Sequence, residues 1–333
     1  MIITKTPFRF SMFGGGTDYA DWYKNHGATI IAAALDYHCY INFRALPSFF
    51  PHKSKAVYSQ IETVNNNADF RHPSIRECLK YTGIRHGVEL HHDSDIPAKT
   101  GIGSSSSFTV GLLRAIHIHK KQKLSQRQLA EMAIHIEREL IGEHVGVQDQ
   151  TMAAFGGFRK LVIDKAGKLQ VTPLPISDDY ISFLEQNILF GFTGKTRLSQ
   201  TYSEKIVDQI KQRSLDECLH QMHSLAIEAL GRFEAECDLD ELGQLLHENW
   251  QLKCAIPNGG VSEDFRAFYE SARSIGVIGG KMMGAGGGGA FYFIAPANKH
   301  QKIKEQLPNI KTWLPMRFCD HGAQVIFKGH ENV

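Results

Sequence analysis

Glycines and four consecutive serines give residues 97–107 the composition of an anion-binding loop. The loop stands between an expected strand at 87–92 and an expected helix at 108–121. Glycine lets the backbone approach an anion closely, and the free N–H groups at a helix start point toward that anion. A glycine turn with a serine N-cap is the plainer interpretation. Four serines at a helix start are harder to explain in that way, because serine is only a fair helix former.

Two other glycine-rich segments, 14–19 and 284–290, adjoin expected strands. Asp18 follows the glycine turn of the first segment, where it could accept hydrogen bonds from sugar hydroxyls or cap the next helix. The glycines of 284–290 cost backbone entropy in any ordered state. A close approach to a ligand or to another loop would explain them, and a flexible hairpin is the alternative.

One glutamate on a predicted helix could bind a ligand. Ser125 and Gln128 form a capping box at the start of a helix whose apolar face continues to Leu140. Glu137 lies at one edge of that face, where a carboxylate can be half-shielded and directed along a cleft. Glu139 lies at the opposite edge, so periodicity alone does not choose between the two.

Asp149 stands in the polar segment 147–150, which has glycines on both sides. Such an aspartate could polarise an attacking hydroxyl group. It could equally cap a helix that begins at Gln150.

The elements that must position these residues suggest two domains, because the chain has 333 residues. Pro173 and Pro175 mark a break, and we place the boundary near residue 175. Residues 46–70 are expected to form a long loop with short strands, and helices are expected from Ser199 to about Leu252. The expected strands are 1–13, 29–35, 37–43, 87–92, 156–163, 188–192, 277–281, 290–294 and 323–327.

Composition excludes several classes of function. The formal charge is +2, so broad electrostatic capture of nucleic acid or of a membrane surface is not expected. The six cysteines form no Cys-x-x-Cys pair, and no apolar stretch approaches the roughly twenty residues of a membrane helix. The chain starts without a signal-peptide pattern, and we expect a cytoplasmic protein. Gly194-Lys195-Thr196 is not a Walker A loop, because position 189 is Leu.

The three glycine-rich motifs, taken in this order, resemble the superfamily of galactokinase, homoserine kinase, mevalonate kinase and phosphomevalonate kinase, the GHMP kinases. The resemblance spans essentially the whole chain. It implies an α+β, two-domain fold, with a ribosomal-protein-S5-like domain at 1–175 and a ferredoxin-like domain at 176–333. It also implies ATP and Mg²⁺ as cofactors, with ATP bound between the domains, and leaves a homodimer open.

Within the superfamily, residues 6–19 resemble the bacterial kinases of D-glycero-D-manno-heptose 7-phosphate. These kinases phosphorylate the anomeric hydroxyl of a sugar phosphate for GDP-heptose and surface-glycan synthesis. Galactokinases carry Gly-Glu-His-Thr-Asp where this chain has Gly14-Gly15-Gly16-Thr17-Asp18. Fucokinase-like enzymes also have glycines there and remain an alternative. An isoprenoid-pathway kinase or a non-catalytic sugar- or nucleotide-binding regulator is a further alternative.

The resemblance implies a role for each matching residue. Asp149 becomes the catalytic aspartate with Arg9 as its basic partner, and Ser105 and Glu137 become the Mg²⁺ ligands. ATP is expected at Lys99, Gly101, Ile102, Gly103, Ser104, Ser105, Ser106 and Ser107. The sugar is expected at Gly15, Gly16, Thr17, Asp18, Gly286 and Gly287.

A phosphorylated sugar also needs a cationic group at its far end. We expect Lys195 and Arg197 to supply it, because both residue types suit phosphate. A solvent-exposed loop without a ligand is the alternative for this pair.

Overall fold

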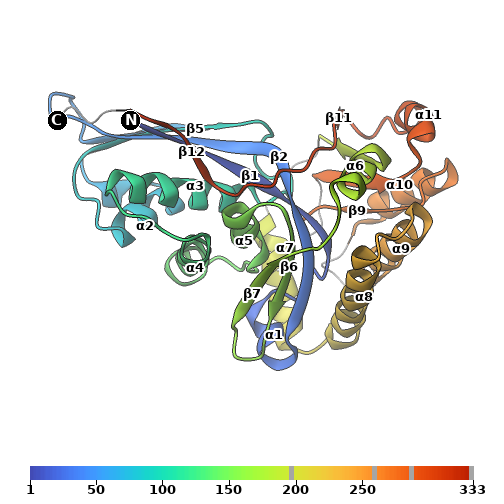
Figure 1. The fold of residues 1–333 in the computed structure, drawn as a ribbon. Helices are drawn as coiled ribbons and strands as arrows, with labels where there is room; N and C mark the ends of the chain where they lie inside the picture. Colours follow the sequence, from blue (N-terminus) through green and yellow to red (C-terminus); the bar gives the residue numbers. More distant parts are fainter. Residues whose placement is uncertain (195–198, 257–260, 285–288, 330–333) are drawn as a thin grey trace.

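The computed structural model describes residues 1–194, 199–256, 261–284 and 289–329, and in these ranges the chain forms two sheets with helices packed on both (Figure 1). The larger sheet consists of β1 (Ile2–Phe13), β2 (Ala28–Ala45), β3 (Ser54–Val57), β4 (Ile61–Val64), β5 (Val88–Ser94), β6 (Phe158–Ile163), β7 (Leu169–Pro173) and β12 (Gln324–Lys328). The smaller sheet consists of β8 (Ile188–Phe192), β9 (Gly279–Met282), β10 (Ala290–Ile294) and β11 (Thr312–Leu314).

The α-helices of the first half are α1 (Ala20–His26), α2 (Pro73–Tyr81), α3 (Ser104–His119), α4 (Gln126–His135) and α5 (Gln148–Phe155). Those of the second half are α6 (Asp178–Asn187), α7 (Ser199–Lys211), α8 (Asp216–Glu234), α9 (Leu239–Ala255), α10 (Glu263–Ser274) and α11 (His300–Gln306). Short 3₁₀ turns cover Asn67–Asp69 and Ala297–Lys299, and Ile136–Ile141 is a π-helix. No helix in the described ranges is both long enough and apolar enough to cross a membrane.

The larger sheet is built around one long antiparallel pair, β1 and β2. We expected two strands at 29–35 and 37–43, but β2 runs without interruption through Asp36. The register shifts between Pro7 and Phe8. Pro7 has no backbone N–H to donate, so a local irregularity there lets the pairing continue.

The helix after the serine run begins earlier than expected, at Ser104. Gly103 is its N-cap residue, with a left-handed φ of 76°, and all four serines lie in the first turn. The helix packs on β1 and β2, and α4 and α5 pack against it. The capping box of Ser125 and Gln128 at the start of α4 is confirmed.

The last strand joins the larger sheet, although it follows the whole smaller sheet in sequence. β12 pairs antiparallel with β1 and lies beside it in Figure 1. The division into domains at residue 175 stays a prediction, but residues 324–328 complete the sheet of the first half. Phe10 on β1 joins the two sheets, because its ring contacts that of Tyr292 on β10 at a centroid distance of 4.3 Å.

Candidate active site

The phosphate-loop candidate, 97–107, meets the other glycine-rich segment. The backbone N–H of Ala290 donates to Thr100 O at 3.0 Å. A Cβ atom on Gly101 would lie 2.6 Å from Met283 O, and one on Gly289 would lie 2.3 Å from Thr100 O. Side chains at these positions would force the two loops apart, so loop contact is one reason for the glycines. Gly286 and Gly287, expected at the sugar, lie outside the described residues.

The serines of the first turn of α3 differ in their hydrogen-bond partners and in their exposure. Gly103 is the N-cap and none of the serine side chains caps the helix, so the N-cap interpretation of the serine run is wrong. The Ser107 hydroxyl donates to Pro7 O, and the Ser106 hydroxyl donates to Glu137 Oε2, both at 2.8 Å. Ser105 is exposed. The first backbone N–H groups of α3 have no partner within the helix and can face an anion.

Arg9 connects this loop to Asp149. Its Nε donates to Asp149 Oδ1 at 2.6 Å and its Nη2 to Oδ2 at 3.2 Å. Its Nη1 donates to Gly101 O at 2.6 Å. The Asp149 side chain is 30% exposed, whereas that of Arg9 is 8% exposed. The carboxylate is therefore held in one orientation by a buried guanidinium and remains reachable by a ligand.

Asp149 lies in the first turn of α5, which begins at Gln148, two residues before the predicted start. A Cβ atom on Gly103 would lie 3.0 Å from Asp149 Oδ2, so the loop backbone passes directly beside the carboxylate. The capping alternative for Asp149 is wrong, because the N-cap residue is Val147 and both carboxylate oxygens bond to Arg9.

Asp18 is buried next to this pair. Its carboxylate accepts hydrogen bonds from the backbone N–H groups of Gly16 and Gln148, each at 3.2 Å. A Cβ atom on Gly146 would lie 1.7 Å from Asp18 Oδ2, so glycine at 146 makes room for the carboxylate. Burial raises the pKa of Asp18, and the charge of Asp149 raises it further. Thr17 is also buried, and its hydroxyl donates to Gly14 O at 2.7 Å.

Glu137, rather than Glu139, faces the interior. Glu137 is fully buried and Glu139 is exposed. Besides the Ser106 hydroxyl, the Gln150 side-chain amide donates to Glu137 Oε2. Burial raises the pKa of Glu137 to about 7, against the lowering effect of the Gln150 hydrogen bond. Glu137 Oε1 and Gln150 Oε1 are buried oxygens without a protein partner, which a hard cation would satisfy.

Two buried lysines on the smaller-sheet side escaped the sequence analysis. Lys281 on β9 is 4% exposed, and its ammonium group donates to Met12 O at 3.1 Å. Lys253 on α9 donates to Met282 O at 3.1 Å and to Gly284 O at 2.6 Å. Burial lowers the pKa of Lys253 to about 8 and lowers that of Lys281 well below its ordinary value. For Lys281, the signal in the sequence was a charged residue inside the strand 279–282.

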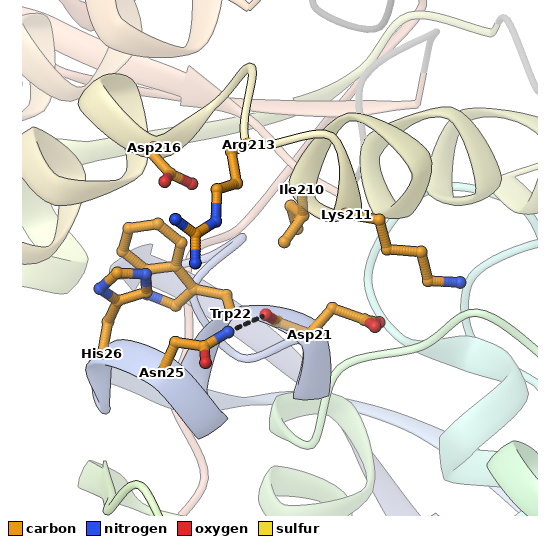
Figure 2. A pocket seen from close by; sticks show the side chains of 8 residues that line it. All are labelled: Asp21, Trp22, Asn25, His26, Ile210, Lys211, Arg213 and Asp216. Carbon is orange, nitrogen blue, oxygen red and sulfur yellow. Dashed lines mark hydrogen bonds between the residues drawn. The ribbon is translucent and has the colours of Figure 1, made fainter.

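A cavity of about 200 Å³ lies between α1 and the helices α7 and α8 (Figure 2). Its lining mixes both charges: Asp21 comes from α1, and Lys211, Arg213 and Asp216 come from the α7–α8 side (Figure 2). None of the residues predicted for the site lines it. Lys195 and Arg197, the predicted phosphate clamp, lie outside the described residues.

Comparison with known proteins decides the family. Residues 72–157 match the GHMP kinases N terminal domain, and residues 226–311 match the GHMP kinases C terminal domain. The chain is 31% identical over 320 residues to D-glycero-alpha-D-manno-heptose 7-phosphate kinase of Campylobacter jejuni. This match covers 91% of this chain and 92% of that protein. The chain belongs to the GHMP kinase family. It is an ATP-dependent sugar kinase, and the family predicted from the three motifs is confirmed.

Other relatives agree on the family and the fold of this GHMP kinase. Mevalonate kinase of Pyrococcus horikoshii is 29% identical over 238 residues, 68% of this chain and 65% of that protein. A solved D-glycero-D-manno-heptose 1-phosphate kinase from Bacteriodes thetaiotaomicron superposes with a TM-score of 0.80 at 21% identity, covering 99% of this chain and 100% of that one. Lactococcus lactis galactokinase, solved with galactose, gives 0.73 at 16% identity, covering 97% and 94%. The predicted two-domain α+β fold of the family is thereby confirmed.

Proposed function

We propose that this kinase transfers the γ-phosphate of ATP to the anomeric hydroxyl of D-glycero-D-manno-heptose 7-phosphate, giving the 1,7-bisphosphate. Similarity to the Campylobacter kinase over 91% of the chain supports this substrate, whereas the match to the Pyrococcus horikoshii mevalonate kinase covers 68%. We expect the product to be consumed by nucleotide activation to GDP-heptose in surface-glycan synthesis. The observation that carries the chemistry is the Arg9–Asp149 pair beside the phosphate loop.

In this proposal Asp149 acts on the attacking hydroxyl. In the proposed step the anomeric oxygen forms a bond to the γ-phosphorus, the bond from that phosphorus to the ADP oxygen breaks, and the hydroxyl proton passes to Asp149. Phosphoryl transfer needs positioning and neutralisation of charge more than covalent help. Arg9 supplies positioning, because it holds both oxygens of Asp149 and the carbonyl of Gly101 at once.

Magnesium fits the residues around Glu137. The unpartnered Oε1 atoms of Glu137 and Gln150 are hard oxygen donors of the kind that Mg²⁺ prefers. We propose Glu137 and Ser105 as its ligands, with the buried Ser106 hydroxyl orienting Glu137. When bound, the ion would neutralise charge on the ATP phosphates.

In this proposal Asp18 holds the sugar. Its two backbone hydrogen bonds orient the carboxylate and leave acceptor capacity for substrate hydroxyls. Asp18 lies near Asp149, because its carboxylate accepts a hydrogen bond from the backbone N–H of Gln148, the residue before Asp149.

One assay tests the proposal. ADP release should be measured with heptose 7-phosphate, free heptose, fucose, galactose, mannose and mevalonate at matched concentrations. The proposal requires the highest kcat/KM on heptose 7-phosphate. A higher value on fucose would support the fucokinase-like alternative. The chain is also 29% identical over 248 residues to the bifunctional fucokinase/GDP-fucose pyrophosphorylase of Arabidopsis thaliana. A higher value on mevalonate would place the chain among isoprenoid-pathway kinases.

A further inference from the structure

We infer that Lys281 binds the phosphate group at the far end of the sugar substrate, in a subsite that it forms with the glycine turn Gly15–Gly16. The inference rests on the proposed function, because it takes the substrate to be a phosphorylated sugar. It replaces the Lys195 and Arg197 pair as the cationic clamp.

The first observation is a buried lysine without a counter-ion. Among the residues that the structure describes, no carboxylate lies within ion-pair distance of the Lys281 ammonium group, and Met12 O is its one hydrogen-bond acceptor. An ammonium group has three N–H donors, so two remain available. Burying an unpaired charge is costly, and a bound anion would relieve that cost.

Neighbouring charges strengthen the argument. Besides burial, the charges of Lys253 and Arg9 lower the pKa of Lys281, and the charge of Asp18 raises it. Arg9 is already paired with Asp149. A bound anion would relieve the repulsion among these basic groups and favour their charged forms, so the region suits a phosphate better than a neutral hydroxyl group.

The second observation is that the glycine turn lies directly against the ammonium group. A Cβ atom on Gly15 would lie 3.2 Å from Ser11 Oγ and 3.7 Å from Lys281 Nζ. Gly16 needs glycine for its φ of 99°, and a Cβ atom there would lie 3.4 Å from Leu219 Cδ2. Gly14 needs it too, because its φ of 76° and a Cβ position 2.0 Å from Thr29 O require glycine for the backbone. Gly15 has no positive φ, and its lack of a side chain leaves the space between the turn and the Lys281 ammonium group without a side chain.

The position of this space assigns it to the sugar rather than to ATP. Asp149 contacts the phosphate loop on one side, through Arg9 and the backbone of Gly103. Its charge also acts on Asp18, which follows the Gly15–Gly16 turn after Thr17. A sugar whose anomeric hydroxyl lies at Asp149 can therefore pass Asp18 and place its distal phosphate at Lys281.

The test compares two substrates in each variant. The readout is the ratio of kcat/KM for heptose 7-phosphate to kcat/KM for free heptose, with the KM for ATP measured in parallel. In Lys281→Met this ratio should fall by about tenfold or more, the scale of one lost charge-assisted hydrogen bond. The KM for ATP should change by less than about twofold, because the subsite is assigned to the sugar and not to ATP. Loss of a hydrogen bond to ATP would instead change that KM by about tenfold.

A matched pair of variants covers the case in which Lys281→Met does not fold. Gly15→Asp places a carboxylate in front of the ammonium group, whereas Gly15→Asn has the same shape without the charge. The aspartate variant should lower the ratio by about tenfold or more, and the asparagine variant by much less. Equal effects of the two would mean that the space is sterically sensitive but does not hold an anion, and would overturn the inference.

Other outcomes also separate the alternatives. An unchanged ratio in Lys281→Met, or a raised KM for ATP instead, would overturn the subsite while leaving the proposed function in place. A fall in the ratio only in the Lys195→Ala, Arg197→Ala double variant would assign the clamp to that pair. Lack of ADP release from the unaltered kinase with heptose 7-phosphate would overturn the proposed function, and the subsite with it.

Discussion

The Arg9 guanidinium binds both carboxylate oxygens of Asp149, although the two residues lie 140 positions apart in the chain. The third contact of the same guanidinium, from Nη1 to Gly101 O, fixes the phosphate loop relative to that carboxylate. One buried side chain thus sets the distance between the place where ATP phosphates are expected and the group that would act on the attacking hydroxyl.

Replacing Asp149 by Asn should lower turnover by about two orders of magnitude or more, the scale expected for losing a general base. The substitution keeps the shape of the side chain and leaves the backbone of the phosphate loop unchanged, so ATP affinity should change little. Turnover at saturating substrates and ATP binding by calorimetry would measure both. Near-normal turnover would remove Asp149 from the catalytic role.

Replacing Glu137 by Gln should raise the Mg²⁺ concentration needed for half-maximal activity by about tenfold or more, corresponding to about 1.4 kcal/mol. Mg²⁺ prefers an anionic oxygen, and Glu137 Oε1 is buried without a protein partner. Glu139→Gln is the control, because Glu139 is exposed on the same segment. A titration in which Glu139→Gln proves the more sensitive variant would contradict the assignment.

Glu137 should contribute a decrease in the stability of the metal-free protein as the pH rises from about 5 to 8. This contribution is in the opposite direction to that of histidines such as His38 and His72, whose pKa values burial lowers to about 4. Burial raises the pKa of Glu137 from 4.5 to about 7, so the folded state holds a proton that the unfolded state has already released. Between these two values the folded state binds more protons, and stability therefore decreases with pH. The loss attributable to Glu137 is at most about 3 kcal/mol.

Urea unfolding at pH 5.5 and pH 8.0 without Mg²⁺ would measure this effect. The free energy of unfolding of Glu137→Gln should gain relative to that of the unaltered protein as the pH rises, because the amide does not titrate. The same pH dependence in both proteins would show that Glu137 makes no such contribution.

The two neighbouring serines should behave differently. Ser106→Ala removes a buried donor to Glu137 and should destabilise the fold by about 1–3 kcal/mol. Ser105→Ala should leave the free energy of unfolding nearly unchanged, because Ser105 is exposed, but should raise the Mg²⁺ requirement. Thermal unfolding and a Mg²⁺ titration of both variants separate the two roles. If only Ser106→Ala changes the Mg²⁺ requirement, Ser106 replaces Ser105 as the proposed ligand.

Gly146→Ala should lower kcat/KM for the sugar by about tenfold or more, the effect of about 1.4 kcal/mol. The new methyl group would stand 1.7 Å from Asp18 Oδ2 and must displace that carboxylate. Gly231→Ala in α8 is the control, since a Cβ atom there meets nothing within 4 Å and alanine favours the helix by about 0.5–1 kcal/mol. Unchanged kinetics in Gly146→Ala would mean that Asp18 does not contact the sugar.

The sequence by itself determined the local features. The capping box of Ser125 and Gln128 is found where it was predicted, as is a strand–loop–helix unit around residues 97–107. Each depends on residues within a few positions of one another, where capping and hydrophobic spacing act directly. The order of the three glycine-rich motifs was also sufficient to predict the family.

Only the tertiary structure decided which groups meet. Residues 136–141 form a π-helix, so the spacing of about 3.6 residues per turn that left Glu137 and Glu139 equivalent does not apply there. The pairing of β12 with β1, the contact of Arg9 with Asp149 and that of Lys281 with Met12 join residues more than a hundred positions apart. Such contacts depend on how the two sheets pack together, and short-range patterns of residue type carry no information about that packing.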